Sequence, residues 1–308
     1  MTIDALKMKR LSESLAAGEV RGRSLWADAR QRFMRNKAAV AGVVLLALVT
    51  LYAFCGEWVA AYTFDYKDFM IMGHAAQTGQ PSFANGHYFG VDNDGRDLFA
   101  VTAQGTRISL MVGIVGMVIS VIVGTIYGAV SGYAGGRTDS VMMRIVDILL
   151  AIPFMFVIIL LLVMFGRSLV MLFAGIGLLS WLNMARIVRG QTLSLKHKEY
   201  IEAARATGVP AWKIILRHVT PNLLGIVAVY ATLLVPEMIL TESFISFLGL
   251  GVQSPMTSLG ALISDGAKTM QYHTIWALFV PLFFFITTMF AFYFVGDGLR
   301  DALDPKDR

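Results

Sequence analysis

Six long apolar stretches dominate this sequence and limit what it can fold into. A helix needs about 20 apolar residues to cross the hydrocarbon core of a bilayer, which is about 30 Å thick. Only helices and closed barrels satisfy their backbone polar groups inside a bilayer. The stretches lie at residues 38–58, 108–133, 145–165, 169–188, 223–248 and 274–295. Since 56% of all residues are hydrophobic and only 15% are charged, we expect an all-α, polytopic membrane protein with six transmembrane helices.

The positions of lysine and arginine predict how the chain is oriented. Nine of these residues lie in 1–37, two in 134–144, seven in 186–217 and three after 298. Cytoplasmic loops carry an excess of positive charge, so the sequence predicts a multi-pass protein with both termini in the cytoplasm. The net charge of +5 follows from this bias and is not a sign of nucleic-acid binding. The single cysteine, Cys55, allows no internal disulfide.

The same pattern divides the chain into four segments. Residues 1–37 form a basic cytoplasmic segment, which has apolar residues at helical spacing from Arg21 to Met34. It is typical of an amphipathic helix on anionic lipid, although a solvated lead-in to the first span is an alternative. Residues 38–107 hold the first span and a periplasmic loop, and 108–295 form a core with five spans. Residues 296–308 form a cytoplasmic tail.

The polar stretch at residues 189–222 lies between the fourth and fifth spans and is expected to be structured. Residues Glu199 to Ala206 favour a short helix, and Gly208 is suited to end it in a left-handed conformation. Pro210 fits the first turn of a second helix. We therefore predict a helix-turn-helix on the cytoplasmic face.

Charged residues and prolines inside the spans are costly in lipid and therefore informative. Arg144 and Asp147 are three residues apart, so an ion pair within one helix is expected. Pro153 should bend that helix, and Pro236 should interrupt the fifth span.

The fifth span carries two acids. Glu242 follows Glu237 by five residues, about 140° around the helix, so the two cannot share one site. Glu242 shares its face with Met238 and Ser246. We regard these four residues as candidates for a pore or gate; the alternative is that either acid lies near the outer headgroups.

Glycines in the second span predict a close contact between helices. Gly124, Gly128 and Gly132 recur every four residues, which leaves one helix face almost without side chains. Small residues at this spacing let helices approach closely. The face is therefore expected to pack against another helix or to line a pore.

The outer loop carries several acids between residues 86 and 97. Asp92, Asp94 and Asp97 suggest a calcium loop, but Arg96 lies among them and the expected bidentate glutamate is missing. We interpret the segment as tight turns and expect no metal site.

Several segments of the sequence resemble those of a known family. Glu202-Ala203-Ala204, Gly208 and Pro221 resemble the EAA loop of ABC importer permeases. The ending His218-Val219-Thr220-Pro221-Asn222 departs from the general I-x-L-P pattern, and resembles the branch that imports peptides and nickel.

Three further segments resemble the same branch. The outer loop, with Asp92, Gly95, Arg96 and Asp97, is similar to its G-T-D-x-x-G-R-D signature, with Val91 in place of Thr. Residues 246–251 are similar to its S-F-L-G-L-G motif. Residues 296–305 are similar to its G-D-x-L-R-D-x-L-D-P ending, through Asp297, Arg300 and Asp301 among others. The whole chain most resembles the C-type permease subunit of oligopeptide importers.

The resemblance implies a type I ABC importer permease fold in a bacterial inner membrane. It implies that the loop docks on a separate ATPase, with Glu202 making polar contacts and Gly208 permitting the turn. The residues assigned to ATPase coupling are Tyr200, Glu202, Ala203, Ala204, Arg205 and Gly208. No G-x-x-x-x-G-K-S/T motif occurs in the sequence, so ATP and Mg²⁺ are expected on partner subunits and no cofactor on this chain.

The resemblance further implies four kinds of partner. These are a second, nonidentical permease, two ATP-binding subunits, a periplasmic or lipid-anchored peptide-binding protein, and membrane lipid. Dipeptides, antimicrobial peptides or nickel chelates are alternative cargoes.

Two other classes of protein fit the sequence less well. An ion-coupled transporter or channel would not need a structured cytoplasmic loop, and no inverted repeat is visible. An intramembrane protease would need His-Glu-x-x-His, which is absent, or Gly-x-Gly-Asp, where Phe294 replaces the first glycine.

Overall fold

The structure is a computed structural model that describes residues 25–303. The predictions for Arg21–Ser24 and for the last two residues of the C-terminal motif, Asp304 and Pro305, lie outside these residues.

Every regular element in residues 25–303 is a helix, in agreement with the predicted all-α class. The elements are α2 (Leu25–Arg35), α3 (Lys37–Val59), α4 (Ala75–Thr78), α5 (Leu98–Ala134), α6 (Gly136–Ala151), α7 (Phe154–Phe165), α8 (Leu169–Leu195), α9 (Glu199–Ala206), α10 (Ala211–Ile214), the π-helix η1 (Ile215–Val219), α11 (Thr220–Phe247), α12 (Leu259–Thr269), the 3₁₀-helix η2 (Met270–Tyr272) and α13 (Trp276–Leu303).

Within the described residues, five helices are long and apolar enough to span a membrane. They are α3, α5, α8, α13 and the run formed by α10, η1 and α11. Helices α6 and α7 make a sixth span if they are counted together, but they are bent by 72° where Pro153 separates them. The six predicted spans are thus all helical, and the third is broken rather than merely bent.

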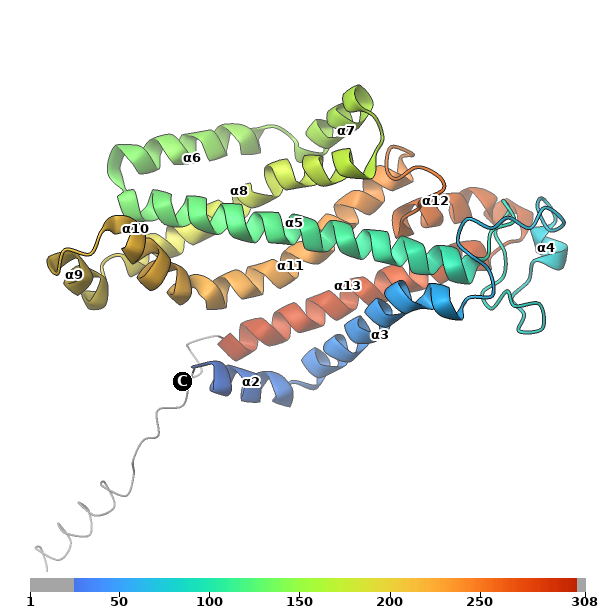
Figure 1. The fold of residues 1–308 in the computed structure, drawn as a ribbon, viewed down its shortest axis with the longest axis horizontal. Helices are drawn as coiled ribbons and strands as arrows, with labels where there is room; N and C mark the ends of the chain where they lie inside the picture. Colours follow the sequence, from blue (N-terminus) through green and yellow to red (C-terminus); the bar gives the residue numbers. More distant parts are fainter. Residues whose placement is uncertain (1–24, 304–308) are drawn as a thin grey trace, which may run out of the picture.

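The spans run side by side along the long axis of the molecule (Figure 1). Helix α5 packs against α8, α11 and α3, and α13 packs against α3, α11 and α12. Helix α9 lies at one end of the bundle, whereas α4 and the 60–97 loop lie at the opposite end (Figure 1). The polar loop between spans four and five and the long loop after span one therefore occupy opposite faces, as the predicted topology requires.

The glycines of α5 form a close helix contact, as predicted. A Cβ atom at Gly124 would lie 2.6 Å from Cβ of Met184, and one at Gly132 would lie 2.8 Å from the carbonyl oxygen of Arg189. At Gly128 it would collide with the carbonyl oxygen of Ala185. All three glycines thus face α8, so this face is a packing surface.

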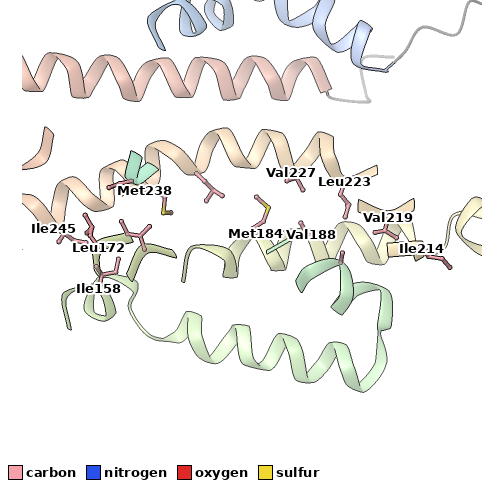
Figure 2. Packing of buried hydrophobic residues seen from close by; sticks show 14 of the residues in the cluster. Ile158, Leu172, Met184, Val188, Ile214, Val219, Leu223, Val227, Met238 and Ile245 are labelled. Atoms are coloured by element: carbon pink, nitrogen blue, oxygen red, sulfur yellow. The ribbon is translucent and has the colours of Figure 1, made fainter. Parts of the chain in front are cut away.

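A buried apolar cluster joins the spans to the α9–α10 segment (Figure 2). At one end it holds Ile158 and Ile245; at the other it reaches Ile214 and Val219, next to α9. Ile201 of α9 belongs to the same cluster and is fully buried. Burying such a side chain stabilises the fold by about 2 kcal/mol, so α9 and α10 are part of the folded core.

Two predictions about the spans are wrong. Pro236 does not interrupt the fifth span, because α11 runs through it as one continuous helix. Prolines are tolerated in membrane helices where neighbouring groups satisfy the freed backbone. Asp147 pairs with Arg186 of α8 at 2.8 Å instead of with Arg144 of its own helix, because α6 lies alongside α8.

Candidate functional site

The segment predicted to be a helix-turn-helix consists of α9, a turn and α10, but α10 continues through η1 into α11 instead of ending before the fifth span. Helix α9 ends at Ala206, and Gly208 follows with φ of +80°, the left-handed conformation that was expected. The N–H of Gly208 donates to the carbonyl of Arg205, and that of Val209 donates to Ala204. Pro210 directly precedes α10 and has the extended conformation of a capping residue.

Helix α9 has one buried and one exposed face. Ile201 and Ala204 are buried, whereas Glu202, Ala203 and Ala206 are exposed. The carboxylate of Glu202 therefore lies on the surface, next to small side chains that allow close approach. Tyr200, Arg205 and Gly208 are also exposed. The motif thus presents polar and small residues on the surface, on a helix whose opposite face is buried.

This helix is tied to the end of α5. Nε of Arg205 donates to the hydroxyl of Tyr133 at 3.1 Å, and the guanidinium lies 4.7 Å from the centre of that ring. Nζ of Lys196 donates to the carbonyl of Gly132 at 3.2 Å. The side chain of Arg205, one of the six residues assigned to ATPase coupling, thus contacts the end of α5.

A second polar cluster holds three helices together near the same end. Arg189 of α8 donates twice to the carboxylate of Asp139 of α6, at 2.6 Å each, and Ser131 of α5 donates to the same carboxylate at 2.6 Å. We call Ser131, Asp139 and Arg189 the inner cluster. Sequence reasoning missed it, because its three residues lie on three different helices and no local motif links them.

The candidate pore residues separate into two environments. Glu242 is fully buried, and its carboxylate accepts hydrogen bonds from Ser246 at 2.6 Å, Ser109 at 3.1 Å and Ser243 at 3.4 Å. The hydroxyl of Ser109 also accepts from the N–H of Leu259, at the start of α12. Glu242 therefore joins α5, α11 and α12 instead of facing an open space in this chain.

Glu237 has the opposite environment. Its side chain is exposed and lines a cavity of about 170 Å³ between the α6–α7 break, α8 and α11. Met238 lines the same cavity, although it is almost fully buried. Ser246 is also buried. Of the four candidates, the structure brings Glu237 and Met238 to a cavity, and places Glu242 and Ser246 in a closed hydrogen-bonded cluster.

The acidic outer loop is a set of internally bonded turns. The carboxylate of Asp92 accepts from Nε of Arg96 at 2.7 Å and from the N–H of Arg96 at 2.8 Å. Asp97 caps α5 through the N–H of Ala100 and contacts Nδ1 of His87 at 3.0 Å. Burial raises the pKa of both carboxyls, opposed at Asp92 chiefly by the charge of Arg96 and at Asp97 chiefly by the hydrogen bond with His87.

Gly95 shows why this loop needs its glycine. It has φ of +77°, and a Cβ atom there would lie 2.5 Å from the carbonyl oxygen of Asp68. The interpretation of this loop as tight turns agrees with these contacts. Across residues 25–303, no three His, Cys, Asp or Glu side chains come together as a metal site would require.

The C-terminal motif lies at the α9 end of the bundle. Asp297, Arg300 and Asp301 are exposed, and the carboxylate of Asp301 accepts from Nδ2 of Asn36 at 3.5 Å. A Cβ atom at Gly298 would collide with that of Ala39. The motif thus joins α13 to the start of α3.

Comparison with known proteins agrees with this geometry. Residues 121–308 match the family described as "Binding-protein-dependent transport system inner membrane component". The chain belongs to this family. Residues 24–76 match a second family, the N-terminal TM domain of oligopeptide transport permease C.

Individual members of the transport family are similar along almost the whole chain. The oligopeptide transport system permease protein OppC of Haemophilus influenzae is 53% identical over 98% of this chain and 95% of its own length. The OppC protein of Escherichia coli K12 is 54% identical over 98% of this chain and 97% of its own length. The dipeptide transport system permease protein DppC of Bacillus subtilis is 42% identical, with 91% and 86% covered. As a binding-protein-dependent transport component, the chain is a multi-pass permease subunit.

Proposed function

We propose that this chain forms half of the translocation pore of an ATP-driven oligopeptide importer and couples to a separate ATPase through residues 189–222. The observation that carries the proposal is the structure of α9. Its exposed face presents Glu202, Ala203 and Ala206, and its buried face places Ile201 in the apolar cluster that continues into α11. A force applied to the exposed face therefore reaches a spanning helix through packed side chains.

The proposal includes the remaining subunits. ATP and Mg²⁺ are bound by two partner ATPase subunits, since this sequence has no phosphate-binding loop. A second, nonidentical permease completes the pore, and a peptide-binding protein delivers substrate to the face that carries the 60–97 loop. This arrangement places the chain in a bacterial inner membrane with α9 and both termini in the cytoplasm, as the lysine and arginine distribution favours.

The proposed cargo rests on the relatives. The relatives with more than half of their residues identical are oligopeptide permeases. We propose that the translocation path passes the cavity lined by Glu237 and Met238.

Docking of α9 is tested by Gly208→Asp. Gly208 has φ of +80° and open space around it, so an aspartate adds a charged side chain to the proposed docking surface without an internal clash, although the positive φ strains the backbone. We expect the variant to insert into the membrane normally but to retain much less ATPase during co-purification.

Gly73→Asp is a matched control. Gly73 has φ of +76° and open space around it, but lies in the loop at the opposite end of the molecule. It should retain the ATPase fully. Equal retention by both variants would show that Gly208 lies outside the docking surface.

A further inference from the structure

The cavity beside Glu237 collects groups that carry negative charge or accept hydrogen bonds. It is lined by residues of α6, α7, α8 and α11, including Ile152, Asn183 and Glu237. Most of the other lining side chains are apolar, so charge in the cavity is poorly screened. A carboxylate inside a spanning segment is expected to face water or a partner of opposite charge.

Glu237 has no such partner within the described chain. The hydroxyl of Thr241 donates to the backbone carbonyl of Glu237 at 2.8 Å. Within the described residues, the carboxylate of Glu237 has no hydrogen bond of its own. Its carboxylate takes part in none of the ion pairs formed by the described residues. The carboxylate is therefore available to a group outside this chain.

The broken third span brings the C-terminal end of α6 to the same cavity, through Leu149, Leu150 and Ile152. Helix α6 ends at Ala151, and the N–H of Ile152 donates back to Leu149 at 3.3 Å. The next residue, Pro153, has no N–H to donate. A helix end leaves carbonyl groups without partners within the helix and carries a partial negative charge. In secondary transporters, the C-terminal ends of broken helices coordinate Na⁺ or H⁺.

We propose that this cavity is a cation-binding subsite, in which Glu237 and the C-terminal end of α6 receive an alkylammonium group of a peptide in transit. The ammonium comes from the peptide N-terminus or from a lysine side chain. The Asn183 amide lies on the cavity wall and offers a further acceptor oxygen. This inference rests on the proposed function, because it assigns the chemistry that the path recognises.

The first experiment measures the charge in the cavity without requiring transport. Cys55 is the only cysteine, so Cys55→Ser with Asn183→Cys places one thiol on the cavity wall. In the assembled complex, the reaction rates of a cationic trimethylammonium methanethiosulfonate and its anionic sulfonate counterpart are compared. Adding Glu237→Gln should lower the cationic-to-anionic rate ratio about tenfold, as expected for a unit charge at close range.

Matched variants define the outcome. Glu237→Asp should retain most of the ratio, and Asp28→Asn, which removes an acid from α2, should not change it. An unchanged ratio in Glu237→Gln, or a thiol that neither reagent reaches because lipid or the second permease covers it, would overturn the subsite.

The second experiment identifies the source of the ammonium group. Proteoliposomes with the complete complex take up peptides that differ only by acetylation of the N-terminus or of one lysine. In Glu237→Gln the preference for the free amine over the acetylated one should fall several-fold, at the N-terminus or at the lysine, whichever binds in the cavity. If the wild-type complex imports no peptide at all, the proposed function fails; if it imports both members of each pair in the same ratio as Glu237→Gln, only this inference fails.

Discussion

The buried Glu242 cluster allows a quantitative prediction about stability. The carboxylate is fully buried and accepts from Ser246 at 2.6 Å, Ser109 at 3.1 Å and Ser243 at 3.4 Å. A hydrogen bond contributes about 0.5–1.5 kcal/mol, leaving a buried partner without one costs about 1–3 kcal/mol, and deleting a side chain leaves a cavity. The two shorter bonds dominate, because the third is close to the distance limit.

We expect Glu242→Ala to lower the free energy of unfolding by about 3–5 kcal/mol. Part of the loss is recovered, since serines in helices can bond to carbonyls of the preceding turn. Glu242→Gln keeps one acceptor oxygen and the volume of the side chain, so it should cost about 1–2 kcal/mol. The order of stability is therefore wild type, then Gln, then Ala.

The assay is thermal unfolding of purified protein in detergent, followed by tryptophan fluorescence. Glu237→Ala is the matched control: it removes the same side chain from the same helix, but at an exposed site where the carboxylate has no hydrogen bond within the described residues. Its Tm should change little. A Tm for Glu242→Ala that equals that of Glu237→Ala would refute the claim that the serine cluster stabilises the C-terminal end of α11.

Two further predictions concern the α5–α8 contact and the inner cluster. Gly128→Leu should prevent α5 from approaching Ala185 and lower the free energy of unfolding by about 3 kcal/mol or more. This would be measured as a lower Tm or as loss of folded protein. Unchanged stability would contradict the close contact. Arg189→Met leaves the carboxylate of Asp139 with the hydrogen bond from Ser131, and should lower the free energy of unfolding by about 1–3 kcal/mol, because the pair is partly exposed. Asp139→Asn combined with Arg189→Met should recover part of this loss. Strictly additive losses would show that the two residues do not interact.

Much of the fold could be predicted because membrane helices leave a strong signal in sequence. The lengths of the apolar stretches predicted the spans, and the regular spacing of the glycines predicted the face of α5 that packs against α8. The start of α5 was less visible: the predicted span begins at residue 108, but the helix begins at Leu98, where Asp97 caps it. The added turns are buried by tertiary contacts, which hydropathy does not report.

The polar residues were harder to predict, because their partners lie far away in sequence. Helical spacing correctly placed Met238, Glu242 and Ser246 on one face. It could not show that this face is closed by Ser109, which is 133 residues away from Glu242. Asp147 likewise found its partner on another helix.

The central claim is that this chain moves peptides only when a separate ATPase drives it through α9. The direct test is uptake of a labelled oligopeptide into proteoliposomes that contain both permeases and both ATPase subunits, with the binding protein added outside. We expect accumulation that requires ATP and the ATPase subunits, and that is largely lost in Gly208→Asp but not in Gly73→Asp. Accumulation that continues without ATP, or that is unaffected by Gly208→Asp, would contradict the account.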